Sequence, residues 1–184
     1  LLTENCDSLL PTIRSRCVTL TMNPVEKDKI CTYLENKFQL EPEQAQIAAN
    51  YCQGNIGKAI RFASSSDFIE MKNQVLKLLK NLDSMDIASI IDTIKEFSTH
   101  KNDINDYLDL MLLWYRDVLM FKVTKDANLL LYSDEYSAIS EQATKRDYEN
   151  IENIIAAIDK AKVRLKANVN FDVTIELMIL AMKD

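Results

Sequence analysis

The stretch from Ile104 to Phe121, INDYLDLMLLWYRDVLMF, decides the fold class of this 184-residue chain. Its apolar residues recur every three or four positions, which is the period of an α-helix. Between Leu110 and Tyr115 six consecutive apolar residues cover most of the helix circumference. We therefore expect a long helix at the buried centre of a helical bundle. No apolar run in the chain exceeds six residues, which is far shorter than the roughly 20 residues of a membrane-spanning helix.

Similar patterns continue on both sides of this stretch. Residues 68–82 and 87–94 precede it with two amphipathic stripes, and a polar connector at 133–137 with a short helix follows it. A second long helix then extends from Ile151 to Asn168, and Asn170 is placed to cap a final helix over 171–182. We expect residues 67–184 to form one helical bundle.

Towards the N-terminus the signals predict three shorter helices. Asn23 and Pro24, with Glu26 completing a capping box, predict a helix over 24–38. Pro42 starts a second helix, which ends at the Gln53-Gly54 pair, and Asn55 caps a third over 56–63. The polar stretch 64–67, SSSD, predicts a domain boundary after these helices.

Composition supports an all-α fold and excludes several classes of site. Glycine occurs twice and proline three times, which disfavours sheets with tight turns and glycine-rich nucleotide folds. The net charge of −6 opposes autonomous, non-specific binding to nucleic acid. Four cysteines without a C-x-x-C pair, and the single His100, predict reduced thiols, no disulfide framework and no metal site.

The chain shows no enzyme centre of its own. Phosphate-binding, dinucleotide-binding and zinc-protease motifs are all missing from the sequence. The first residues, Leu1-Leu2-Thr3, contain neither an initiator methionine nor a basic signal-peptide region. We interpret the chain as a C-terminal fragment of a longer cytoplasmic protein.

The most informative motif lies near the start, where a strand-like ending at residues 1–5 precedes Leu9-Leu10-Pro11-Thr12-Ile13-Arg14-Ser15-Arg16-Cys17. This nine-residue stretch resembles the end of the ATPase module in bacterial clamp-loader subunits of the AAA+ family. The resemblance implies that Arg16, within Ser15-Arg16-Cys17, projects into the ATP site of a neighbouring subunit. A guanidinium supplied in this way can stabilise the charge that phosphoryl transfer develops on the γ-phosphate.

Each of these residues also has an ordinary structural interpretation. Arg14 and Arg16 could be solvated cations at a helix end, where the helix dipole favours them; the length of the match favours the arginine finger. Thr3 matches the family's nucleotide-sensing threonine, and an ordinary threonine at a strand end explains it equally well.

A second family position departs from the pattern. ATP-binding members place Gly-x-x-Arg at the start of a lid helix, whereas the corresponding stretch here is Gly54-Asn55-Ile56-Gly57, with Gly57 in place of the arginine. Lys58 or Arg61 could substitute, but each lies at a different angle on the helix. The change argues against ATP binding by this subunit itself. It favours the type of clamp-loader subunit that donates an arginine finger without binding functional ATP.

Two features of the bundle agree with this assignment. The stretch 112–117, LLWYRD, and Asn168-Val169-Asn170 before Glu176-Leu177 resemble the family's collar helices. Trp114 and Tyr115 are expected in the core rather than as a base-stacking platform, and Arg116 and Asp117 as a structural or intersubunit ion pair. A basic run, formed by Lys160, Lys162, Arg164 and Lys166, is expected to be a solvated helix face rather than a DNA-binding surface.

The resemblance implies three domains: the end of an AAA+ ATPase domain (1–23), a three-helix lid (24–66) and a helical collar (67–184). It implies a scaffold in the clamp loader of DNA polymerase III, with γ/τ and δ subunits as partners. Contact with the sliding clamp and primer-template DNA would occur through the complex. ATP would be bound by neighbouring subunits, with no cofactor in this chain and no membrane partner. The alternatives are an ATP-hydrolysing γ/τ-type subunit and a helical adaptor that binds another protein.

Overall fold

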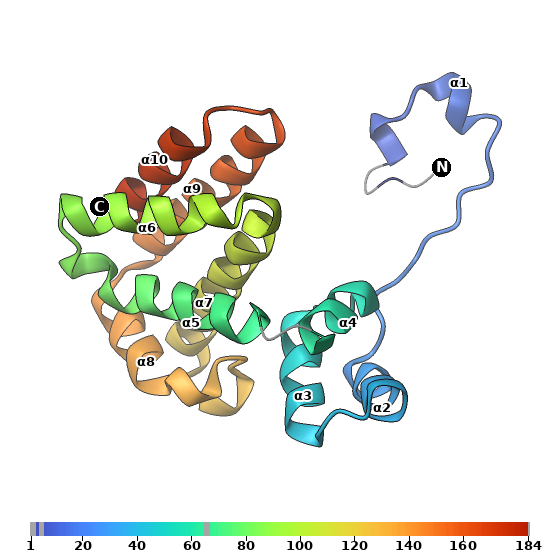
Figure 1. Ribbon diagram of the computed structural model, residues 1–184, viewed down its shortest axis with the longest axis horizontal. Helices are drawn as coiled ribbons and strands as arrows, with labels where there is room; N and C mark the ends of the chain where they lie inside the picture. The colour runs from blue at the N-terminus through green and yellow to red at the C-terminus, as the bar shows by residue number, and fades with distance from the viewer. Residues whose placement is uncertain (1–2, 4–5, 65–66, 184) are drawn as a thin grey trace.

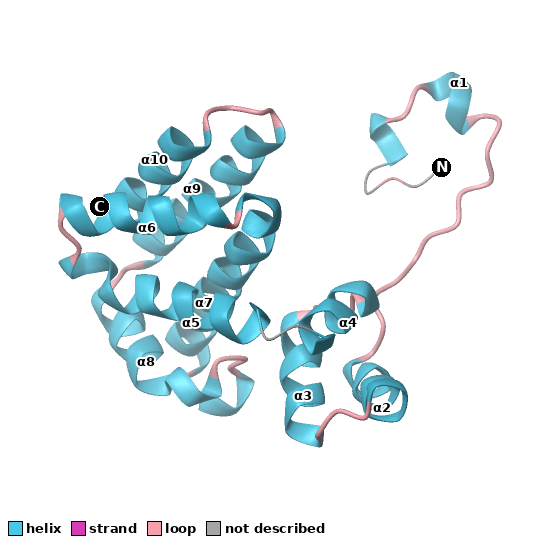
Figure 2. Ribbon diagram, viewed as in Figure 1, coloured by secondary structure: helices cyan, strands magenta, loops and turns pink. Residues whose placement is uncertain are grey.

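The computed structural model describes residues 3, 6–64 and 67–183, and within these residues every regular element is helical (Figure 2). The predicted all-α class is therefore confirmed. Figure 1 shows three parts: an N-terminal segment that lies apart, a three-helix unit and a larger bundle. The α-helices are α1 (Pro11–Arg14), α2 (Lys27–Phe38), α3 (Pro42–Tyr51), α4 (Ile56–Ser64), α5 (Asp67–Asn81), α6 (Ile87–Thr99), α7 (Ile104–Thr124), α8 (Tyr136–Lys145), α9 (Tyr148–Lys166) and α10 (Phe171–Lys183).

The N-terminal segment contains a 3₁₀ turn, η1 (Cys6–Ser8), and the single helical turn α1. An extended stretch connects α1 to α2, and its apolar side chains Val18, Leu20 and Met22 are at least 83% exposed. The strand expected over residues 1–5 falls largely on positions outside the described residues, where only Thr3 is placed.

In the three-helix unit, α2–α4, two of the three predicted helix starts are confirmed. Pro42 occupies the first turn of α3, and Asn55 accepts the Lys58 N–H at 3.1 Å to cap α4. Gln53 and Gly54 both have positive φ, 50° and 81°, so the chain turns where the helix stop was predicted.

The predicted start of α2 is wrong by three residues, because the helix begins at Lys27 and not at Pro24. Residues before it are extended, and the Val25 N–H donates to the Gly54 carbonyl at 2.9 Å. Glu26 occupies the N-cap position without a capping hydrogen bond from its side chain. A Cβ on Gly54 would lie 2.5 Å from the Pro24 Cβ. Docking of residues 24–25 onto Gly54 therefore takes precedence over the local helix-start signal.

The bundle, α5–α10, is built around α7, which packs against α5, α8 and α9 (Figure 1). Trp114 and Tyr115 are completely buried, which confirms their expected place in the core. The Trp114 indole N–H donates to Gln142 at 3.0 Å, and the Gln142 amide donates to the Leu79 carbonyl at 2.8 Å. One buried side chain thus joins α5, α7 and α8 and satisfies the polar edge of the tryptophan.

Asp117 fastens the connection between α7 and α8. Its carboxylate is fully buried and accepts the Leu131 and Tyr132 N–H groups at 2.7 and 2.8 Å. Arg116 donates to the same carboxylate at 2.8 Å, so the predicted ion pair forms within the chain. Burial raises the pKa of Asp117, against the opposing effect of these donors.

The last two helices follow their sequence signals closely. Asn168 adopts a positive φ of 55° after α9, and its N–H and that of Val169 donate to the carbonyls of Leu165 and Arg164. Asn170 then accepts the Val173 N–H at 3.1 Å and caps α10. Helix-end chemistry that is local in sequence was therefore sufficient to predict this turn.

Candidate functional site

Arg16 lies just after the helical turn α1 and is exposed. Its Nη1 donates to the Thr12 carbonyl at 2.7 Å, which uses one of the five N–H donors of the guanidinium. Ser15 donates to the same carbonyl at 3.2 Å, and Cys17 is exposed. Pro11 in the first turn and the Ser15 N–H bonded to its carbonyl hold this short turn. Arg16 is thus on the surface, as an arginine that contacts another molecule must be.

Arg14, two residues earlier, has a different environment. Its Nη1 pairs with Asp7 at 2.8 Å, and both side chains are at least half exposed. The ion pair joins η1 to α1, and its contribution to stability is small because water screens it. Thr3, the residue expected as a nucleotide sensor, is exposed in the N-terminal segment.

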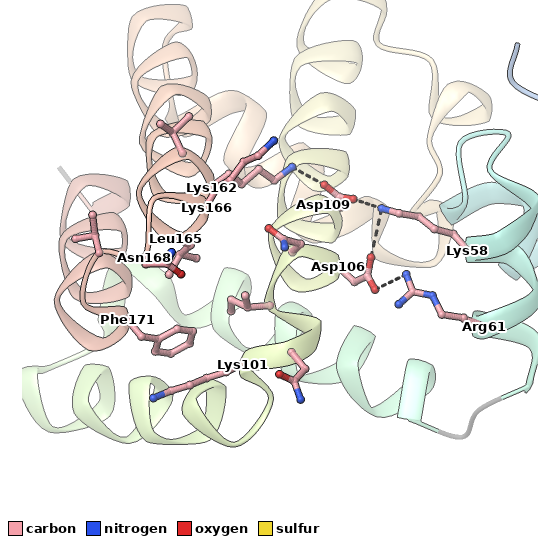
Figure 3. A pocket seen from close by; sticks show the side chains of 15 residues that line it. Lys58, Arg61, Lys101, Asp106, Asp109, Lys162, Leu165, Lys166, Asn168 and Phe171 are labelled. Carbon is pink, nitrogen blue, oxygen red and sulfur yellow. Dashed lines mark hydrogen bonds and ion pairs between the residues drawn. The ribbon is translucent and has the colours of Figure 1, made fainter. Parts of the chain in front are cut away.

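Gly57, where the resemblance leads us to expect the lid arginine, is in the first turn of α4, on the surface. The neighbouring cations do not extend from α4 to a separate site: Lys58 contacts Asp106 and Asp109 of α7, and Arg61 pairs with Asp106 at 2.9 Å (Figure 3). Asp106 is only 6% exposed. Both candidate substitutes for the missing lid arginine are therefore engaged by the bundle.

Asp109 extends these contacts to a third helix, α9. We call the five paired side chains the ionic cluster: Lys58, Arg61, Asp106, Asp109 and Lys162. It accepts hydrogen bonds from Lys58 of α4 and from Lys162 of α9 (Figure 3). Burial acts to raise the pKa of Asp109, but the two lysines outweigh it and the pKa is lowered. Burial likewise acts to lower the pKa of Lys58, and its two aspartates outweigh that effect and raise it. Both groups are thus held in their charged forms.

The basic run on α9 was predicted to be a solvated helix face, and this prediction is wrong at Lys162. Lys160 and Lys166 are exposed, as a solvated face requires, whereas Lys162 and Arg164 are partly buried and Lys162 is paired with Asp109. The pattern within α9 contains no signal for this pairing, because the partner is 53 residues away.

A pocket of about 900 Å³ opens beside this cluster (Figure 3). Four elements surround it: α4, the start of α7 with the preceding turn η3 (Lys101–Asp103), the end of α9 and the start of α10. Sequence reasoning missed Asp106 and Asp109 as site residues. The available signal was their occurrence, three residues apart, in the first turns of a long and largely apolar helix.

The described residues contain no group of three or more His, Cys, Asp or Glu side chains that could hold a metal ion. A search of the same residues finds no helix that is long and apolar enough to cross a bilayer.

Comparison with known proteins relates the whole chain to a DNA polymerase III subunit. The chain is 30% identical over 187 aligned residues to DNA polymerase III subunit delta′ of Bacillus subtilis (strain 168). The alignment covers 100% of this chain and 56% of that protein, so the chain spans about half the length of its relative. No protein-family model matches the sequence. The resemblance to a bacterial DNA polymerase III subunit, inferred from the Leu9–Cys17 motif, is confirmed by this similarity.

Proposed function

We propose that this chain, a homologue of the DNA polymerase III subunit delta′, is a scaffold of the clamp loader in DNA replication and presents Arg16 to the ATP site of a neighbouring γ/τ subunit. The observation that carries the proposal is similarity along the entire chain. The match therefore includes the bundle as well as the short arginine motif. A chance resemblance of nine residues would not extend in this way.

Chemistry and exposure support the role of Arg16. Phosphoryl transfer develops negative charge on the γ-phosphate oxygens, and an arginine supplied by a neighbouring subunit stabilises it. The Arg16 side chain is exposed, and its hydrogen bond to Thr12 leaves most of the guanidinium donors for a phosphate. Such an arrangement makes hydrolysis depend on assembly.

The ionic cluster supports a passive role for this subunit. Lys58 and Arg61, the cations closest to the altered lid position Gly57, are paired with Asp106 and Asp109. In this proposal, residues 1–23 belong to an AAA+ domain, 24–66 form the lid and 67–184 form the collar. The collar would join the γ/τ and δ subunits in the cytoplasm, and the assembled complex would contact the sliding clamp and primed DNA.

The test is the substitution Arg16→Ala, with Arg14→Ala as the matched control because Arg14 is also exposed and cationic. The full-length protein that contains this chain is assembled with γ/τ and δ subunits, and clamp-stimulated ATP hydrolysis is measured. Loss of an arginine finger reduces related reactions by on the order of a thousandfold at the site it serves. We expect that loss at the neighbouring site for Arg16→Ala, and near-normal turnover for Arg14→Ala.

Size-exclusion chromatography of the same mixtures separates a catalytic effect from an assembly defect. We expect both variants to co-elute with the partner subunits. Unchanged turnover in the Arg16→Ala complex would remove the arginine-finger role. Failure of the unsubstituted protein to co-elute would leave the adaptor interpretation, and an intact G-x-x-x-x-G-K-[ST] motif together with ATP hydrolysis by this subunit would favour the γ/τ type.

A further inference from the structure

The pocket between the three-helix unit and the bundle has a local charge opposite to that of the chain. Among the side chains that line it are five cations and two carboxylates, which gives a formal charge of +3 in a chain of net charge −6. The cations are Lys58, Arg61, Lys101, Lys162 and Lys166, and the carboxylates are Asp106 and Asp109. Figure 3 shows that these side chains come from helices on opposite sides of the pocket.

The carboxylates are already matched by three of the cations. Lys58, Arg61 and Lys162 form the ionic cluster with the two aspartates. Lys166 has no ion pair within residues 3, 6–64 and 67–183, and Lys101 lies over the Phe171 ring at 5.0 Å from its centroid. Two lysines therefore contribute positive charge that the pocket's own carboxylates do not neutralise.

Backbone geometry adds to the positive potential. The first turns of α7 and α10 both border the pocket, and a helix N-terminus bears partial positive charge, which Asp106 in the first turn of α7 and the Asn170 cap of α10 partly offset. The end of α9 also borders it, but two of its terminal carbonyls accept the Asn168 and Val169 N–H groups. The amides of Asn102 and Asn105 supply additional polar lining.

We infer that this pocket binds a small phosphate-bearing molecule of the nucleotide type. Lys166 would contact the phosphates, next to the paired Lys162 on the same helix, and the side chains of Val163 and Val169 would offer an apolar surface for a flat organic group. A volume of about 900 Å³ is within the range of small-molecule pockets. This site does not depend on clamp-loader assembly.

A compact anion fits the pocket better than a strand of nucleic acid does. A long polyanion would extend beyond the pocket onto a surface whose overall charge is negative. A di- or triphosphate is short enough to stay within the pocket, whose lining has a formal charge of +3. A nucleotide and DNA carry the same phosphate groups. The length of the polyanion is therefore what distinguishes the expected ligand from DNA.

Isothermal titration calorimetry on the 184-residue chain tests the site with three probes: inorganic pyrophosphate, ATP and the oligonucleotide dT20. We expect saturable binding of pyrophosphate and tighter binding of ATP. Both should weaken as the salt concentration rises, because the contacts are ionic. Tighter binding of dT20 than of ATP would overturn the inference in favour of a nucleic-acid surface, and absence of saturable binding by pyrophosphate and ATP would also overturn it.

Two substitutions with opposite expected effects locate the binding. Lys166→Gln should weaken ATP binding about tenfold, whereas Asp109→Asn should strengthen it severalfold, because it removes negative charge beside Lys162. Lys160→Gln is the matched control, since Lys160 is exposed on the same helix and does not line the pocket.

Circular dichroism melting curves establish that each variant is folded before titration. If Asp109→Asn does not fold, the comparison of Lys166→Gln with Lys160→Gln still decides the location. Equal ATP affinities for these two lysine variants would place binding elsewhere and refute the site.

Discussion

Among the described residues, the three-helix unit meets the bundle through aromatic contacts and through ionic ones. On one side Phe68 of α5 stacks on Phe62 of α4 at 4.2 Å between ring centroids and contacts Tyr51 of α3 at 5.7 Å. On the other side α4 contacts α7 through Lys58, Arg61 and their aspartates. The aromatic contact excludes water without fixing one precise geometry, whereas the ionic contact requires specific donors to meet specific acceptors.

This difference predicts a division of roles at the junction. Burial of apolar surface supplies most of the free energy that holds the two parts together, at roughly 25 cal/mol per Å². The charged groups contribute less net free energy, because each must lose part of its hydration. They select one orientation of α4 on α7, since other orientations would leave Asp106 buried without a partner.

The largest expected effect comes from Phe68→Ala. The side chain is 3% exposed, and removal of a buried phenyl ring costs about 3–5 kcal/mol. We expect a loss of that size in the free energy of unfolding, measured by urea denaturation with circular dichroism. Ile69→Ala is the control, because the neighbouring Ile69 is 60% exposed and should change stability little. Equal losses for the two variants would contradict the role of the aromatic contact.

A smaller effect is expected for Asp106→Asn. The substitution keeps the shape but removes the charge that pairs with Lys58 and Arg61. Hydrogen bonds to charged groups contribute about 1.5–3 kcal/mol, and the exposure of Arg61 places the expected loss at the lower end. The same urea experiment measures it. The control is Asp92→Asn, because Asp92 forms an exposed pair with Lys95. If Asp106→Asn lowers the free energy of unfolding no more than Asp92→Asn does, the junction does not need the charge.

The smallest effect is the pH dependence of the ionic contact. The lowered pKa of Asp109 means that its contribution to stability is present above its unfolded value, about 3.9, and is lost as the pH falls through the folded pKa. The raised pKa of Lys58 gives a contribution that is present below about 10.4 and is lost as the pH rises through the folded value. The contact should therefore be constant from about pH 5 to 9.

Comparison of the unsubstituted chain with Asp109→Asn isolates this contribution, because Asp83 also has a lowered pKa and titrates in the same direction. We expect the stability difference between the two proteins to be constant near neutrality and to shrink below about pH 4. A difference that stays unchanged down to pH 2 would show that Asp109 does not act through its charge.

Sequence reasoning was most successful where the deciding interaction is local. Asn55 and Asn170 cap the helices that were expected, because each cap is a hydrogen bond to a residue three positions ahead. The core position of Trp114 followed from the apolar circumference of its helix. Sequence reasoning failed at Pro24, where docking onto Gly54 prevents the helix from starting.

In the candidate site, too, sequence reasoning identified the local feature and missed the long-range contacts. The motif around Arg16 was recognisable because its residues are consecutive, and its exposure agrees with the proposed role. The contacts of Lys162 with Asp109, and of Arg61 with Asp106, join residues 53 and 45 positions apart. No periodicity within one helix indicates which cation faces which carboxylate.

The sequence by itself determined the all-α class, the order of the helices and most of their ends, because apolar periodicity and caps act over a few residues. Only the tertiary structure decided that α4 and α9 meet at Asp109, that this junction borders a cationic pocket, and that the candidate substitutes for the lid arginine are paired with the bundle. The physical reason is that electrostatic pairing depends on distance in space, and the packing of the helices sets that distance.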